Sequence, residues 1–250
     1  MKMKSKWIKF LSSSEFDEIR KNCKTVILPV GATEVYGPHM PLGSDIIVAQ
    51  DIAELVAEQT NALVGPSFEV GESYSLSNYP GTLLLQPETW KAVVTDYMHS
   101  LMKWGFTQFM FINGHAGNVP IITQICRPLQ REHGIKTAQI DWWRFTQAKA
   151  KGICEYEGWM CHGHASECGT SVMLYLHPEY VDMDKARRVT PKQGEAYGKY
   201  SDFITYAPFS DTTECGILGD ATVATAEKGR LIVEKCVQRI VEYMHEEFQC

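Results

Sequence analysis

The sequence predicts an α/β fold in which helices cover both faces of a mainly parallel sheet. Short apolar runs, such as residues 24–30 (KTVILPV) and 107–112 (TQFMFI), are typical of strands that are buried on both faces. Segments with apolar residues at helical spacing separate these runs, and this alternation favours parallel strands joined by right-handed crossovers. Because the 250 residues contain no repeat or linker, we expect residues 1–250 to form a single domain.

Each element follows from its local pattern. The expected strands cover residues 24–30, 62–64, 107–112 and 135–140. Apolar residues at helical spacing predict helices around residues 48–56, 87–104, 166–176 and 232–244, and Asn118 is expected to cap another helix. Residues 66–81 are rich in Gly, Ser, Pro and Tyr, which predicts a long loop that forms part of a substrate pocket.

Charge and composition exclude several classes of protein. The net charge of −6 comes with no basic stripe, so we expect neither a nucleic-acid partner nor a membrane partner. The lysine-containing start, MKMKSKWIKF, lacks the apolar core of a signal peptide, and no run reaches the roughly 20 apolar residues of a membrane span. We therefore expect a cytoplasmic protein whose eight cysteines, which form no C-x-x-C pair, are free thiols.

Polar side chains gather where the predicted strands end. The loop GATEVYGPHMPLGSD (residues 31–45) follows the first strand and carries Glu34, His39 and Asp45, and NGHAGN (residues 113–118) follows another strand and carries His115. Ligands bind beyond the carboxyl ends of parallel strands, which favours a functional site over a solvated surface turn. Together with Glu167, these carboxylates and the imidazole of His115 are ligand types that Zn²⁺, Mn²⁺ and Fe²⁺ accept.

Three strings are more specific than the residue types alone. LPVGATEVYGPHMPLGSD, FINGHAGN and GHASECGTSVMLYLHPEYVD resemble, in order and spacing, the signature segments of the creatininase (creatinine amidohydrolase) family, and GDATVATAEKG at residues 219–229 extends the resemblance. The resemblance implies a three-layer α/β/α sandwich and assembly into homo-oligomers, usually hexamers. It also implies one or two divalent metals that serve to hydrolyse C–N bonds in small molecules.

Carried over by position, the resemblance makes Glu34 and His115 ligands of one metal, Asp45 a bridging carboxylate and Glu167 a ligand of the second metal. Two departures stand out. The family's Glu-Gln-His is here Glu34-Val35-Tyr36, and the His-Tyr-Glu of creatininase itself is His115-Ala116-Gly117. A phenol is a poor ligand at neutral pH. We therefore expect one tightly held ion, Zn²⁺ before Mn²⁺ or Fe²⁺, and a loosely bound second ion whose stoichiometry Tyr36→His would raise.

These assignments predict a metal-dependent hydrolase that directs water at a carbonyl or amidine-like carbon of a small, cyclic, polar substrate. His164 is the expected general acid/base, Tyr36 the expected donor to the developing oxyanion, and Glu167 completes the catalytic set. The expected substrate-binding residues are His39, Tyr74, Trp142 and Trp143. Two alternatives remain open: hydrolysis of a C–C bond that opens a cyclic diketone such as an oxidised inositol, and an inactive homologue that only binds a ligand.

Overall fold

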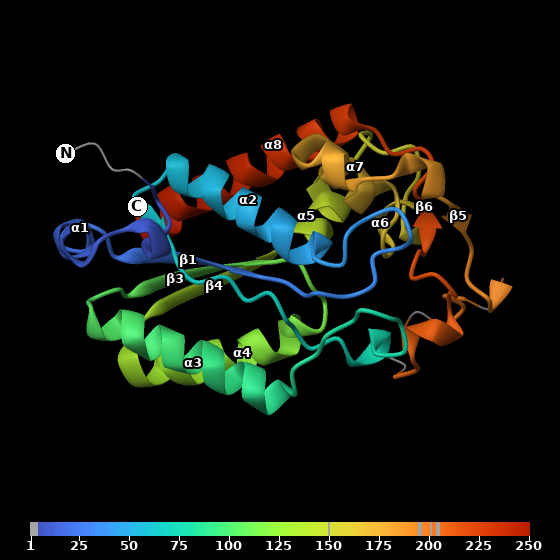
Figure 1. Ribbon diagram of the computed structural model, residues 1–250. Helices are drawn as coiled ribbons and strands as arrows, with labels where there is room; N and C mark the ends of the chain where they lie inside the picture. The colour runs from blue at the N-terminus through green and yellow to red at the C-terminus, as the bar shows by residue number, and fades with distance from the viewer. Residues whose placement is uncertain (1–4, 150, 195–196, 201, 204–205) are drawn as a thin grey trace.

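The computed structural model describes residues 5–149, 151–194, 197–200, 202–203 and 206–250 (Figure 1). Residues 1–4, which belong to the lysine-containing start discussed above, lie outside the described residues. Figure 1 shows a sheet between two layers of helices, so the expected α/β sandwich is confirmed. None of the helices in the described ranges is long and apolar enough to cross a membrane.

The central sheet has four parallel strands in the order β2-β1-β3-β4. They are β1 (Thr25–Val30), β2 (Ala62–Val64), β3 (Gln108–Asn113) and β4 (Lys136–Asp141), each within one residue of the expected bounds. Every residue of β1 is buried, as is β3 apart from its first residue, since both strands lie in the middle of the sheet with helices on either side. All four strands point the same way, so their carboxyl ends share one edge.

Two hydrophobic clusters fill the space between the layers. Residues of α2 (Ser44–Glu58), α7 (Glu167–Leu176) and α8 (Ala226–Tyr243) pack on one face of the sheet. Residues of α3 (Pro87–Lys103) and α4 (Asn118–His133) pack on the other face. Figure 1 shows this division, with α3 and α4 below the sheet and the other three helices above it.

Several elements were not predicted from the sequence. A short helix, α5 (Trp142–Lys149), follows β4 directly, α6 (Trp159–His162) precedes the GHASEC string, and β5 (Arg188–Val189) pairs with β6 (Gly219–Asp220). An N-terminal helix, α1 (Ser13–Ile19), begins at a capping box formed by Ser12 and Glu15. The remaining short turns of helix cover Ile8–Phe10, Tyr74–Leu76, Pro178–Tyr180, Met183–Lys185, Phe209–Asp211 and Met244–Phe248.

The expectation that Asn118 caps α4 is wrong, since the cap position is one residue earlier. Gly117 occupies the cap position of α4 without a side-chain bond, and Asn118 is the first helical residue. Its amide instead donates to the Gly31 carbonyl at 3.0 Å and accepts from the Glu72 N–H at 3.2 Å. Asn118 thus ties the loop after β1 to the long loop at residues 66–81, which satisfies backbone groups that would otherwise be buried without partners.

Glycines allow α2 to approach the ends of two strands very closely. A Cβ added at Gly31, directly after β1, would lie 2.6 Å from the Cα of Ile46, and one at Gly114, directly after β3, would lie 2.3 Å from the Asp45 carbonyl oxygen. Both contacts are with backbone atoms, which cannot move aside as a flexible side chain could. The first turn of α2, which carries Asp45, is therefore seated against both strand ends.

We predict that Gly31→Ala destabilises the protein by about 3 kcal/mol, because the added methyl group overpacks a rigid backbone contact. The matched control is Gly43→Ala, where an added Cβ would make only ordinary contacts at 3.7 Å or more. Urea unfolding of the two variants measures the difference. Equal stabilities of the two variants would show that α2 can move away from β1 at little cost.

Candidate metal centre

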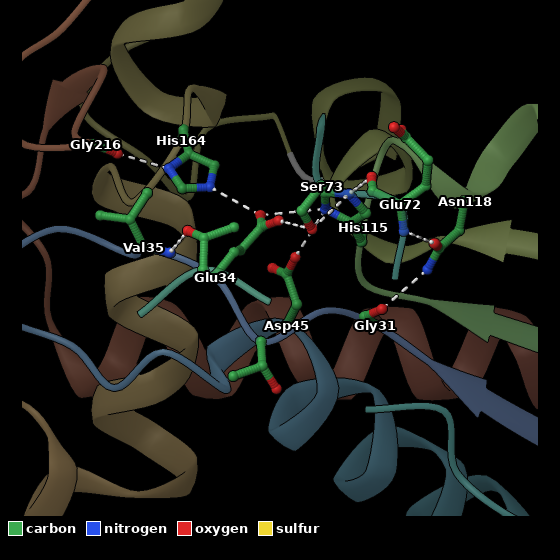
Figure 2. Close-up of polar contacts among 12 residues, drawn as sticks. Gly31, Glu34, Val35, Asp45, Glu72, Ser73, His115, Asn118, His164 and Gly216 are labelled. Carbon is green, nitrogen blue, oxygen red and sulfur yellow. Dashed lines mark hydrogen bonds and ion pairs between the residues drawn. The ribbon is translucent and has the colours of Figure 1, made fainter. Parts of the chain in front are cut away.

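Three buried side chains converge at the carboxyl edge of the sheet (Figure 2). Glu34 comes from the loop after β1, Asp45 from the first turn of α2, and His115 from the loop after β3. One ligand atom from each residue lies within 4.8 Å of the others. The position of Asp45 at a helix N-terminus suits a negative charge. The structure thus brings together the three residues expected to bind the first metal.

The imidazole of His115 faces both carboxylates through a single nitrogen. Its Nδ1 lies 3.1 Å from Oε1 of Glu34 and 3.3 Å from Oδ2 of Asp45, while its Nε2 lies 2.6 Å from the Glu72 carbonyl oxygen. That carbonyl accepts a hydrogen bond from Nε2–H, so Nδ1 is the nitrogen that faces the two carboxylates. Two carboxylates that share one ring nitrogen require a positive charge, carried by the protonated ring or by a bound cation, and a backbone acceptor on the far nitrogen is the usual partner of a metal-binding histidine.

The pKa values of the three groups reflect how closely their charges lie. Burial and the charge of Glu34 raise the pKa of Asp45 to about 6. Burial opposes the charged forms of Glu34 and His115 as well, but their mutual attraction holds the pKa of the Glu34 carboxyl well below its usual range and raises the pKa of His115 far above its usual value. Two carboxylates this close repel each other unless a cation separates them, so the donor set fits a divalent transition metal.

A second histidine stands on the other side of Glu34. His164 donates from Nδ1 to the Gly216 carbonyl at 2.6 Å, and its Nε2 lies 3.3 Å from Oε1 of Glu34 (Figure 2). Burial opposes its charge, yet the bond to Glu34 and the nearby carboxylates raise the pKa of His164 overall. The next residue, Ala165, is fully buried with a left-handed φ of 51°, a conformation that costs energy for a residue with a Cβ and that the surrounding packing must hold in place.

Tyr36 is buried between the metal centre and α7. Its ring lies 4.6 Å from the ring of His164, and a Cβ added at Gly169 would lie 3.2 Å from its hydroxyl oxygen. Burial, then the charges of Asp45 and Glu34, raise the pKa of the phenol well above its usual value. Tyr36 therefore remains a neutral hydroxyl beside the carboxylates.

A cavity of about 270 Å³ opens onto these groups. Trp142, Trp143, Leu76 and Phe209 supply apolar wall, and His162, His164 and Ser75 supply polar atoms. The long loop at residues 66–81 contributes to the pocket as expected, through Ser75 and Leu76, and Ser73 donates to Oε2 of Glu34 at 2.6 Å. Trp142 and Trp143 line the cavity, although Trp142 is also part of the hydrophobic core.

The structure places Glu167 outside this centre, so its expected role as a metal ligand and catalytic group is corrected. Its fully buried carboxylate accepts from the N–H groups of Glu155 and Tyr156 at 2.8 and 3.3 Å, and from Nζ of Lys228 at 2.7 Å. Lys228 belongs to the GDATVATAEKG string and comes from α8. The carboxylate is therefore already neutralised by an ammonium group of the same chain and turned toward α8.

Two expected substrate-binding residues also lie away from the cavity. His39 is buried, with Nε2 bonded to the Thr170 hydroxyl at 2.9 Å, and burial lowers its pKa to about 4. It is a neutral packing residue. Tyr74 is 60% exposed and points out of the loop whose neighbouring residues, Ser73 and Ser75, reach the site. The sequence pattern identified the loop but not which of its side chains face inward.

Three residues that contact the centre or its cavity were not predicted from the sequence: Ser73, His162 and Phe209. Ser73 lies in a loop, His162 ends the short helix α6 and Phe209 begins a short helical turn, and none of these segments has a periodic pattern. The GDATVATAEKG string did carry a signal for Lys228. Its role could not be derived, because its partner Glu167 lies 61 positions away.

Comparisons with known proteins agree with this geometry. The family model for creatininase, described as creatinine amidohydrolase, matches residues 9–244. The chain is similar to creatinine amidohydrolase of Pseudomonas putida, with 32% identity over 89% of each protein. It is also similar to a mycofactocin precursor peptide peptidase of Mycobacterium tuberculosis (27% identity, 94% of this chain and 91% of the relative). A 3-dehydro-scyllo-inosose hydrolase of Thermotoga maritima is 26% identical over 90% of this chain and 78% of that protein.

Solved structures extend the match over nearly the whole chain. A manganese form of creatininase superposes with a TM-score of 0.84 at 30% identity, covering 98% of this chain and 99% of that one. A variant creatininase of Zn–Zn type gives a TM-score of 0.81 at 30% identity and the same coverage. A family model that spans most of the residues, a relative above 30% identity and a shared fold agree with the resemblance seen in the sequence: the chain belongs to the creatininase family.

Proposed function

We propose that this protein is a metal-dependent hydrolase that cleaves a C–N bond in a small, uncharged, cyclic substrate. The observation that carries the proposal is the position of His115 Nδ1, which faces the carboxylates of Glu34 and Asp45 at 3.1 and 3.3 Å beside an open cavity. Creatininase structures of manganese and Zn–Zn type support a divalent transition metal at this position. Zn²⁺ is the ion we expect first, with Mn²⁺ or Fe²⁺ as alternatives.

The chain's own residues provide the remaining chemistry. When bound, the cation supplies a Lewis acid and makes water acidic enough to act as a nucleophile near neutral pH. His164 holds a proton at Nε2, on the side of Glu34 that borders the cavity, and its bond to Gly216 fixes the ring orientation. It can therefore deliver that proton to a leaving nitrogen. Tyr36 keeps its proton and can donate a hydrogen bond to an oxygen that gains negative charge.

The residues that line the cavity favour an uncharged substrate. Among the described residues that line it, none is a lysine or arginine, so a carboxylate or phosphate group would find no lysine or arginine to pair with. Two tryptophans and Phe209 offer flat apolar surfaces to a small ring. These features favour a neutral lactam or cyclic amidine, in keeping with the relative named creatinine amidohydrolase.

A second candidate is ring opening of a cyclic diketone by C–C hydrolysis. It is supported by the relative named 3-dehydro-scyllo-inosose hydrolase and by the polar atoms of Ser75, His162 and His164, which could bind ring hydroxyl groups. Both reactions begin with the attack of water on a polarised carbonyl carbon.

A screen of lactams, cyclic amidines, formamides, short peptides and diketo-inositols tests the proposal. Turnover of a lactam or amidine supports it, turnover of a diketone alone supports the second candidate, and retention of metal with no turnover of any of them would favour a binding protein.

The domain organisation, the oligomeric state and the location of the protein are further parts of this proposal. We propose that the protein is a single domain, since the family model runs through residues 9–244 without a break. We also propose a homo-oligomer, a hexamer by the family resemblance, which light scattering would test. Its location is proposed to be the cytoplasm, where the eight cysteines, all free in the structure, would stay reduced.

We predict that His115→Ala reduces bound metal from one equivalent to well below one and lowers turnover by more than about a hundredfold, since even outer partners of metal ligands cost up to that much. The fold is expected to survive, because His115 lies in a loop. Elemental analysis and circular dichroism measure both effects. His133→Ala, at an exposed position at the end of α4, is the control and should behave as wild type. Unfolding of His115→Ala would instead make His115 a structural residue.

The position of Glu167 changes what is expected of Tyr36→His. With Glu167 paired to Lys228, a second cation in Tyr36→His would have only Asp45 and the new imidazole as protein ligands. In the wild type, the Tyr36 ring itself fills the space above Gly169. At Gly117, where creatininase has a glutamate, an added Cβ would lie 2.0 Å from the Glu72 carbonyl oxygen. We therefore predict one tightly held metal per subunit in the wild type and no second tight metal in Tyr36→His. Metal titration is the measurement, and two tight equivalents in either protein would contradict it.

A further inference from the structure

A pair of cysteines lies beside Glu167, apart from the metal centre. Sγ of Cys154, Sγ of Cys161 and a carboxylate oxygen of Glu167 lie within 4.8 Å of one another. Cys161, in α6, is fully buried, whereas Cys154 is partly exposed and lines a separate cavity of about 610 Å³. The two thiols are thus close together, and one of them is accessible from solvent.

The same three atoms resemble a metal site, but the local charge opposes a cation. Nζ of Lys228 lies 2.7 Å from Oε1 of Glu167 and donates also to Oε1 of Glu155 at 3.3 Å and to the Val223 carbonyl at 2.7 Å. A divalent ion bound by Glu167 would stand next to this ammonium group. We therefore expect the two sulfur atoms to react with each other and not to bind a metal ion.

We propose that Cys154 and Cys161 are a redox-active dithiol that a low-molecular-weight disulfide converts to an intramolecular disulfide. The Cys154 thiolate attacks the small disulfide, forming a mixed disulfide and releasing one small thiolate. Cys161 then attacks Sγ of Cys154, and its proton passes to the second small thiolate as that group leaves. The protein dithiol is oxidised by two electrons, and one small disulfide is reduced to two thiols.

The surroundings of the two sulfurs set this order of attack. The hydrogen bond to Cys154, followed by burial and the nearby thiol and carboxylate groups, raises the pKa of Cys161, which disfavours Cys161 as the first attacking thiolate. Cys154 faces the larger cavity, where a small disulfide can approach. Cys154 is therefore the attacking thiol and Cys161 the resolving one.

The bond would join two segments next to the catalytic histidine. The Cys161 carbonyl accepts a hydrogen bond from the Ser166 hydroxyl at 2.5 Å, and His164 lies between these two residues in the chain. Closing the 154–161 loop would therefore restrain the segment that carries His164. The inference about the dithiol itself is independent of the proposed hydrolase activity.

The test uses the full-length protein with its metal, incubated with oxidised glutathione and analysed by peptide mass spectrometry. Wild type is expected to lose two of its eight free thiols and to yield a reducible cross-link between the peptides of Cys154 and Cys161. Cys161→Ser should accumulate a stable mixed disulfide on Cys154, and Cys154→Ser should form neither product. Cys126→Ser, which removes a partly exposed thiol on α4, is the matched control and should cross-link as wild type does.

Two outcomes would overturn the proposal. Glutathione that stays on Cys154 in the wild type would show that Cys161 cannot reach it. A second equivalent of Zn²⁺ that protects both cysteines from oxidation, and that is lost in Cys154→Ser but not in His115→Ala, would show that the sulfurs form a metal site.

Discussion

The architecture around the site depends on the burial of two carboxylates, Glu34 and Asp45, at one point of the sheet edge. Burying a single unpaired charge is costly, and burying two of the same sign side by side is more so. The close approach of α2 to the strand ends at Gly31 and Gly114 places the backbone of Asp45 at this edge. His115 completes the set from the loop after β3, with Nδ1 facing both carboxylates and Nε2 bonded to the Glu72 carbonyl.

Sequence patterns predicted the sheet and the convergence of Glu34, Asp45 and His115 because both depend on local signals. The strands are continuous apolar runs, Glu34 and His115 lie in loops that follow strand ends, and Asp45 lies in the first turn of the helix after β1, so parallel topology brings them to one edge. The same patterns failed for side-chain direction. Glu167 begins a helix beside the site, but successive helical residues point about 100° apart, and residue type alone does not show which side faces the ligand.

Tyr36 illustrates how a departure from a family pattern is accommodated by its neighbours. Its phenol needs the space above Gly169, where any side chain would begin 3.2 Å from the hydroxyl oxygen. The second departure, Gly117, leaves room for the Glu72 carbonyl to reach His115 at 2.6 Å. Each substitution alone looks like the loss of a ligand. In the structure, the Glu72 carbonyl and the Tyr36 ring occupy space next to the first metal site, and the carbonyl orients the His115 ring.

Glu34 and Glu167 differ in where their counter-charges come from. Both are buried and both accept hydrogen bonds, so burial and residue type do not distinguish them. Glu167 has its counter-charge within the chain, in Lys228, and removing either partner would leave an uncompensated buried charge. Glu34 shares its surroundings with a second carboxylate and with two histidines whose far nitrogens are occupied by backbone carbonyls. Its ion-pair partners are these two histidines, so protons on their rings or an added cation supply its counter-charge. A pair of buried carboxylates that faces histidines next to a cavity therefore marks the candidate site, and it becomes visible only when partners distant in sequence are placed together.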